Sequence, residues 1–187
     1  FMIGIGYCQA GNWIYKHFTM NEATLEEEER VVDEFLDYID EIKNDFVEYY
    51  GTEIPDTVIP KVFHWTHAEI SIMRAVNARH QHKWTERISE QNIMWADFHK
   101  VYEDEPIAIK GVMGHRLKDI VNAMKCHGLI NVSWPSDGPS NGFAAMQWAS
   151  AYYEKKDKLD AEIDDIKRTQ VYAIRYARVK ELIDGII

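Results

Sequence analysis

A long amphipathic segment near the start of the chain constrains the fold more than any other feature. Thr24 is followed three residues later by Glu27, which is the spacing of a capping box at a helix start. Beyond it, apolar side chains recur at helical spacing, at Val32, Phe35, Ile39, Ile42 and Phe46. A helix with one apolar face has to bury that face against other elements, so the chain is predicted to build a hydrophobic core. We interpret the acidic face of the same helix as solvated charge.

The segments on either side of this helix alternate between strand-prone and helix-prone runs. Phe1 to Cys8 and Trp13 to Phe18 are apolar and β-prone, and the turn Gln9-Ala10-Gly11-Asn12 between them predicts a hairpin. The later segments are a buried strand at Lys61 to Trp65, a helix at Ala68 to Arg79 with Ile72, Ala75 and Val76 inward, a short apolar run at Ile93 to Ala96, a helix with Leu117, Ile120, Val121 and Met124 that Gly128 stops, a loop at Trp134 to Gly142, and closing helices at Phe143 to Tyr153 and Leu159 to Ile186. This order predicts a mixed α/β fold in which helices cover a sheet and the hairpin supplies an antiparallel edge.

Length and composition favour one globular domain over residues 1–187. The 187 residues are 46% hydrophobic and 28% charged, and no obvious linker divides them. No apolar run approaches the roughly 20 residues that span a bilayer, so we expect no membrane association. Cys8 and Cys126 form neither a disulfide framework nor a metal-binding spacing, which favours a reducing, intracellular compartment, cytoplasmic or nuclear. The chain opens at Phe1 without an initiator methionine, and we expect it to be part of a longer polypeptide.

The charge distribution is uneven along the chain. A formal net charge of −10 argues against a protein whose whole surface binds nucleic acid. The middle section nevertheless gathers basic side chains, which leaves room for a local basic face. These are Arg74, Arg79, Lys83, Arg87, Lys100, Lys110, Arg116, Lys118 and Lys125.

The stretch from Val62 to Glu69 carries the clearest chemical signal. A strand runs out into a short polar turn, and Glu69 follows in the first turn of the next helix. Open α/β sheets bind ligands at the carboxyl ends of their strands. A carboxylate at such a place can hold Mg²⁺ or Mn²⁺, because these hard cations prefer oxygen ligands.

Several short motifs resemble those of the DEDD-type 3′–5′ exonucleases. His64 and Glu69 occupy the histidine and acid positions of the second motif of that family, with Trp65 in place of its asparagine. Trp95-Ala96-Asp97 resembles the strand-ending aspartate of the family, and His115 to Ile120 resembles the helix start of ribonuclease H-like domains associated with RecB-type and viral nucleases. The resemblance implies a ribonuclease H-like fold and removal of nucleotides from the 3′ end of single-stranded DNA or RNA.

The resemblance also implies roles for individual residues. Glu69 would bind Mg²⁺ or Mn²⁺, Tyr172 would orient the attacking water, His64 and Asp97 would support the site, and Arg116 and Lys118 would contact the nucleic-acid backbone. Each position has a plain structural interpretation as well. Glu69 and Asp97 suit a helix start, Tyr172 and Tyr176 suit a packed aromatic pair, and Arg116 and Lys118 suit a solvated helix surface.

Two departures from the family pattern bear on activity. The family places an Asp-x-Glu pair on its first strand, whereas no acid precedes Glu22 here, so we expect that strand either upstream of Phe1 or absent. Tyr176 stands where the third motif has an aspartate. Two-metal hydrolysis needs several carboxylates to hold both ions, and we therefore expect this chain by itself to be weak or inactive as an enzyme.

Two other functions fit parts of the sequence. His64, His67, His80 and His82, with Glu69 among them, could supply ligands to a zinc ion, although the helical spacing separates the two histidine pairs. A catalytically inactive nuclease fold could also persist as a module that binds a protein partner or nucleic acid. Its six tryptophans and ten tyrosines include candidate anchors for such a partner.

Overall fold

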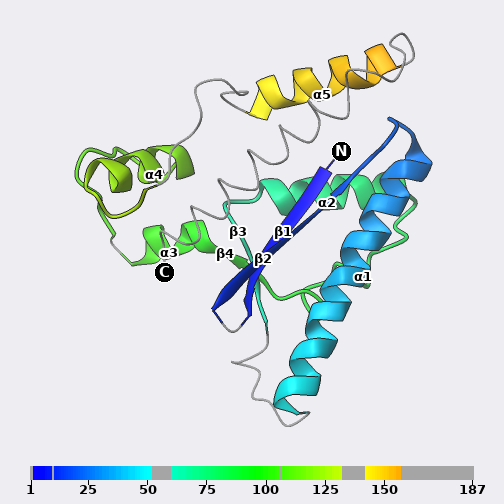
Figure 1. Cartoon of the computed structure of the whole chain (residues 1–187), viewed down its shortest axis with the longest axis horizontal. Helices are drawn as coiled ribbons and strands as arrows, with labels where there is room; N and C mark the ends of the chain where they lie inside the picture. The colour runs from blue at the N-terminus through cyan, green and yellow to red at the C-terminus, as the bar shows by residue number, and fades with distance from the viewer. Residues whose placement is uncertain (1, 10, 52–59, 106, 132–141, 157–187) are drawn as a thin grey trace.

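The structure, a computed structural model, describes residues 2–9, 11–51, 60–105, 107–131 and 142–156. It confirms a mixed α/β protein (Figure 1). The predicted loop from Trp134 lies outside the described residues up to Gly142, and so does the predicted helix from Leu159 to Ile186. The elements are β1 (Met2–Gln9), β2 (Asn12–Thr19), α1 (Leu25–Tyr50), β3 (Val62–His64), α2 (Ala68–Arg79), β4 (Trp95–Asp97), α3 (Phe98–Asp104), α4 (Leu117–Cys126) and α5 (Gly142–Lys156).

The predicted hairpin is confirmed. β1 pairs antiparallel with β2, from Met2 opposite Thr19 to Gln9 opposite Asn12. The turn includes Gly11, whose φ of 79° is a conformation that glycine adopts without steric cost. Alternate side chains of β1, Ile3, Ile5 and Tyr7, pack against the main core, which is why one face of the hairpin is covered.

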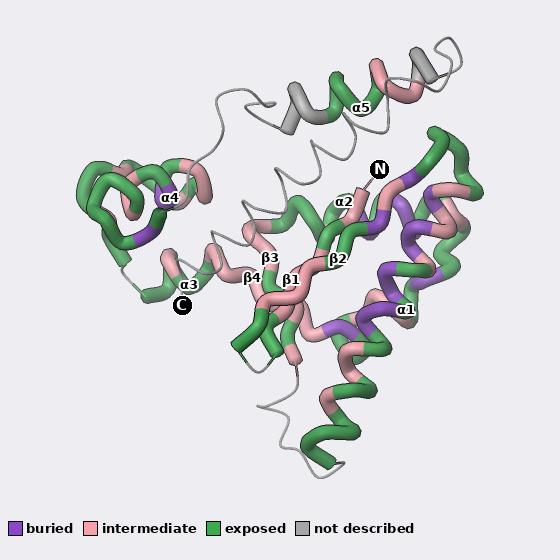
Figure 2. Tube along the Cα trace, viewed as in Figure 1, coloured by how far each residue is buried: buried purple, intermediate pink, exposed green. Residues whose placement is uncertain are grey.

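The predicted long helix is confirmed as α1, and its start forms as expected. Thr24 Oγ1 accepts a hydrogen bond from the Glu27 backbone N–H at 3.2 Å. The Glu27 carboxylate accepts from Asn21 N–H at 2.6 Å and from Arg30, and the Arg30 hydrogen bond lowers the pKa of Glu27 to about 2. The buried residues of α1 extend from Glu28 to Ile39, and the rest of the helix beyond Ile39 is largely exposed (Figure 2).

The core between α1 and the hairpin is completed by α2 and by the turns that follow it. Met73 and Val76 of α2 are buried, together with Trp84 and Ile93 from residues 80–93. The prediction that Ile72 and Ala75 face inward is wrong, because the inward ridge of α2 runs through Met73, Val76 and Asn77. Asn77 is buried and its side-chain oxygen accepts from the Trp84 backbone N–H at 2.8 Å, which fixes the turns over the core.

The strands do not form one sheet within the described residues. β3 pairs in parallel with β4, and this pair is separate from the β1–β2 hairpin. The hairpin therefore does not supply the predicted antiparallel edge to the parallel strands. β3 is also not buried as predicted, because Phe63 is 63% exposed, although its ring meets that of Phe98 in a T-shaped pair at a centroid distance of 5.8 Å.

A second, smaller cluster lies at α4, on the side of the molecule away from α1 (Figure 1). Val121 and Ile130 are buried there, with Leu117 and Met124 packed against them. The chain leaves α4 through Gly128, whose φ of 69° confirms the predicted stop. None of the helices in the described part of the chain has the length and apolar character that crossing a bilayer requires.

Candidate functional site

The carboxyl ends of β3 and β4 bring two predicted site residues together. The register of the parallel pair places Val62 opposite Trp95 and His64 opposite Asp97. Residues that end two adjacent parallel strands lie at the same sheet edge, where α/β proteins bind ligands. The polar residues that follow each apolar run predicted the ends of both strands.

Asp97 joins the two strand exits through backbone hydrogen bonds. Its Oδ1 accepts from Thr66 N–H at 2.9 Å and from His99 N–H at 3.0 Å. The second bond caps α3, which confirms the plain interpretation of Asp97 as a helix start. The first bond holds Thr66 at a φ of 63°, a conformation that β-branched residues rarely adopt, and His64 Nδ1 also bonds the Thr66 carbonyl.

Glu69 lies in the first turn of α2, just after β3. Its side chain is exposed, and it forms no hydrogen bond or ion pair within the described residues. An acid in this position is favourable for the helix dipole, and it is also free to bind a cation. Both interpretations of Glu69 therefore fit its surroundings.

Trp65 connects the strand exits to the next part of the chain. Its ring lies 5.5 Å from that of His99 and 5.4 Å from that of Tyr102, measured between centroids. Its indole N–H donates to the His115 carbonyl at 3.2 Å. At the position where the exonuclease family has asparagine, this chain therefore has a residue that packs against α3 and fixes the loop segment entering α4.

Sequence reasoning missed a group of metal-ligand side chains beside Trp65. His99, Glu103 and His115 have potential ligand atoms that all lie within 4.8 Å of one another. His99 and Glu103 are four residues apart on α3, a signal visible in the sequence once a helix is assigned there. Because α3 was not predicted from the sequence, the helical spacing of His99 and Glu103 was not recognised. His115 comes from a distant segment and was noted only for another motif.

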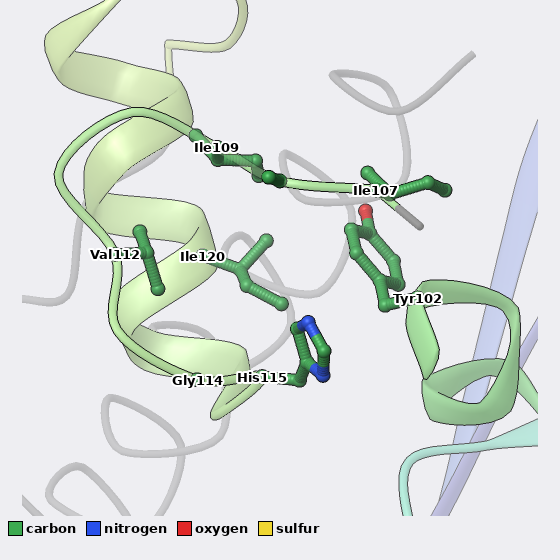
Figure 3. Close-up of a pocket in the computed structure, with 8 residues that line it drawn as sticks. Tyr102, Ile107, Ile109, Val112, Gly114, His115 and Ile120 are labelled. Carbon is green, nitrogen blue, oxygen red and sulfur yellow. The ribbon is translucent and has the colours of Figure 1, made fainter. Parts of the chain in front are cut away.

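A pocket of about 80 Å³ adjoins this group on the α4 side. Figure 3 shows the rings of Tyr102 and His115 beside Ile120, facing the same space. Ile107 and Val112 line its other walls. Burial raises the pKa of the Tyr102 phenol, so this hydroxyl is neutral at physiological pH and can donate a hydrogen bond into its surroundings.

The alternative zinc site considered for His64, His67, His80 and His82 is not formed. In the described part of the chain these histidines do not come together as a ligand group. His80 has a structural role instead, because its Nε2 lies 3.0 Å from Glu28 Oε2 and its ring packs 5.0 Å from that of Trp84. Its side chain is 8% exposed, which leaves little access for a metal ion.

The basic face expected in the middle section is partly neutralised by α1, so the acidic face of α1 is not simply solvated as predicted. Arg79, Lys83 and Arg87 all form ion pairs with acids of that helix. The pairs are Arg79 with Glu28 at 2.7 Å, Lys83 with Glu29 at 2.6 Å and with Asp33 at 2.7 Å, and Arg87 with Asp37 at 2.9 Å and with Asp40 at 2.7 Å. Burial raises the pKa of Asp33, but hydrogen bonds from Lys83 and Trp84 outweigh burial and lower it overall.

The structure describes only some of the remaining predicted site residues. Arg116 precedes α4 as its N-cap and is exposed, while Lys118 lies half-buried in the first turn. Tyr172 and Tyr176 lie outside the described residues, so their predicted relation to Glu69 stays a prediction. Comparison of the chain with protein-family models, with curated proteins and with solved structures finds no match in any of the three.

Proposed function

We propose that this chain is a ribonuclease H-like, exonuclease-like domain that binds a divalent cation and the 3′ end of a single-stranded nucleic acid at the exits of β3 and β4. The observation that supports this most directly is the parallel register, which pairs His64 with Asp97 at one sheet edge. Glu69 follows β3 along the chain, in the first turn of α2. This is the arrangement in which α/β proteins present acids to a ligand.

The ligands at this edge fit one Mg²⁺ or Mn²⁺ better than two. The Glu69 carboxylate is exposed and unpaired within the described residues, whereas one oxygen of Asp97 is engaged by two backbone N–H groups. Hydrolysis by two metals needs more carboxylates than these. We therefore propose cation-dependent binding with weak hydrolysis, in which Arg116 and Lys118 contact phosphates on the outer surface.

Binding of a 3′-labelled single strand in Mn²⁺ tests this proposal, with fluorescence anisotropy for affinity and gel analysis for cleavage. Asp97→Asn keeps an oxygen acceptor for Thr66 and His99 but removes the charge, and Glu69→Gln does the same at the exposed acid. We expect each to weaken Mn²⁺-dependent binding about tenfold, the size typical of a perturbed metal site. Asp104→Asn, at the exposed end of α3, is the matched control and leaves binding unchanged. Mn²⁺-independent binding, or equal loss in all three variants, would refute the proposal.

A second function, an inactive module of the same fold, is favoured by the capping role of Asp97. A carboxylate that holds Thr66 and His99 N–H groups is explained without any metal. The two functions differ in turnover, since the module binds nucleic acid or a protein without cleavage. Tyr176→Asp in a chain extended by an Asp-x-Glu strand separates them, because a gain of Mn²⁺-dependent cleavage supports the enzyme and no gain supports the module.

A further inference from the structure

We propose that His99, Glu103 and His115 form a binding site for a zinc-type transition-metal ion at the junction of α3 and α4. This site is independent of the proposed function, because it uses different side chains. Its ligands are two imidazoles and one carboxylate, a set that suits zinc and related first-row ions. Mg²⁺ and Ca²⁺ prefer oxygen ligands, so the same group discriminates against them.

The spacing of the ligand atoms is close to that of a formed site. His99 Nδ1 lies 3.6 Å from Glu103 Oε2. Two ligands of a tetrahedral zinc ion, each about 2.0–2.2 Å from the metal, are separated by about 3.4 Å. The largest separation within the group is no more than 4.8 Å, so side-chain rotation or a shift of at most about 1.4 Å brings the third ligand into range.

Two separate segments hold the ligands in this arrangement. Asp97 caps α3 and thereby fixes the helix that presents His99 and Glu103 on one face. The loop segment carrying His115 contains Gly111 and Gly114, whose φ values of 95° and 118° lie in a region that other residues rarely adopt. Its backbone is then fixed where the His115 carbonyl accepts the Trp65 indole N–H.

Aromatic rings limit the freedom of both imidazoles. His99 packs against Trp65, and the ring of His115 lies 5.8 Å from that of His99 and 6.3 Å from that of Tyr102. Both histidines are half-buried, whereas Glu103 is exposed. An ion can therefore reach the site from solvent past Glu103, and the rings reduce the rotamer entropy that binding would cost.

Three protein ligands leave at least one coordination position open. Zinc sites with three protein ligands complete their coordination with water or a small ligand. The pocket of about 80 Å³ beside His115 provides room for several water molecules next to the ion. The geometry thus corresponds to an open site rather than to a closed structural one.

Titration of the whole chain with Co²⁺, followed by displacement with Zn²⁺, tests the proposal. Co²⁺ stands in for zinc, and its visible absorption reports coordination number directly, so binding is detected without any assay of activity. We expect one equivalent to bind with the absorption of a four- or five-coordinate ion. Glu103→Gln, His99→Ala and His115→Ala should each weaken binding by at least about tenfold. Circular dichroism of each variant confirms folding, and Glu103→Gln carries least risk because Glu103 is exposed.

His82→Asn is the matched control, since His82 is exposed and asparagine tolerates its φ of 64°. We expect this variant to bind Co²⁺ like the unaltered chain. Unchanged Co²⁺ affinity in folded Glu103→Gln and His115→Ala, or an equal loss in His82→Asn, would overturn the site. Glu69→Gln should leave Co²⁺ binding unchanged while it weakens Mn²⁺-dependent nucleic-acid binding, so failure of either proposal is recognised separately.

Discussion

Two regions of the molecule contain similar residue types that serve different purposes. The α1 region consists of β1, β2, α1, α2 and residues 80–93, and the α3–α4 region consists of α3, residues 107–116, α4 and residues 127–131. Among the described residues, the main core has twelve buried members, all in the α1 region except Met20, which lies between β2 and α1, whereas the cluster in the α3–α4 region has two, Val121 and Ile130. Hydrophobic burial is the dominant stabilising term, so the α1 region accounts for most of the stability of the described fold.

The polar side chains of the two regions also differ. In the α1 region, His80 pairs with Glu28, and their side chains are only 8% and 9% exposed, so this pair is unavailable to a ligand. In the α3–α4 region, His99, Glu103 and His115 lie close together with solvent access and a pocket beside them. Functional sites are commonly placed on the less stable parts of a fold, where a ligand can supply the missing interactions.

The largest expected effect is at Trp84 in the α1 region. Trp84 is 2% exposed and its indole N–H donates to Asp33 at 2.6 Å. Trp84→Ala should lower the free energy of unfolding by about 3–5 kcal/mol in denaturant titration, because it leaves a large cavity and removes one of the hydrogen bonds to the Asp33 carboxylate. Trp148→Ala, at a 53% exposed position of α5, is the control and should change it by less than about 0.5 kcal/mol. Similar losses in both variants would contradict the assignment of stability to this core.

A smaller effect is expected at Glu28, the buried acid of α1. Its hydrogen bond from Arg79 lowers the pKa of Glu28 below the usual 4.5, with burial opposing the shift. Glu28→Gln should lower the free energy of unfolding near neutral pH by about 1–2 kcal/mol, a range reduced because Arg79 is half exposed. Glu26→Gln, at an exposed neighbour, is the matched control.

The pH dependence provides a second measurement for the same pair. A carboxyl with a lowered pKa contributes stability that is complete above 4.5 and is lost as the pH falls through the folded-state pKa. The unaltered chain should therefore lose stability more steeply below pH 4.5 than Glu28→Gln does. If the free energy of unfolding fell equally with pH in the unaltered chain and in Glu28→Gln, the ion pair of Glu28 with Arg79 would contribute little to stability.

The smallest expected effect is at Trp65, and it should stay within the α3–α4 region. Trp65→Phe keeps an aromatic ring but removes the hydrogen bond to His115, at a cost of about 1 kcal/mol. Hydrogen exchange should become faster in α3 and in residues 107–116 and stay unchanged in α1. Trp95→Phe is the matched control. It removes a comparable hydrogen bond, from the Trp95 indole N–H to the carbonyl of Ile88, which belongs to residues 80–93 of the α1 region. Faster exchange throughout α1 in Trp65→Phe would show that the two regions unfold together.

Local sequence signals predicted the elements whose periodicity is long. The hairpin and α1 were correct because alternation and helical spacing extend over many residues there. The short helix α3 was missed because its seven residues give too little periodicity, and its start depends on the capping by Asp97. Ile72 was misplaced because the hydrophobic side of α2 is set by Trp84 and the following turns, which no local pattern encodes.

The candidate sites show the same limit. The strand exits at His64 and Asp97 could be predicted because each lies next to its own apolar run. The pairing of Glu28 with Arg79 joins residues 51 positions apart, and the approach of His115 to His99 depends on a loop with two glycines. Contacts of this kind follow from tertiary packing, so a single sequence does not specify them.

The two cysteines give the molecule a practical property. Cys8 lies on β1 in the α1 region and Cys126 ends α4 in the α3–α4 region, and both are free and exposed. Each region thus carries its own native thiol for a spin label or a fluorophore. A pair of probes attached there would report the separation of the two regions in solution, and any change in it on addition of metal, without engineering a new attachment point.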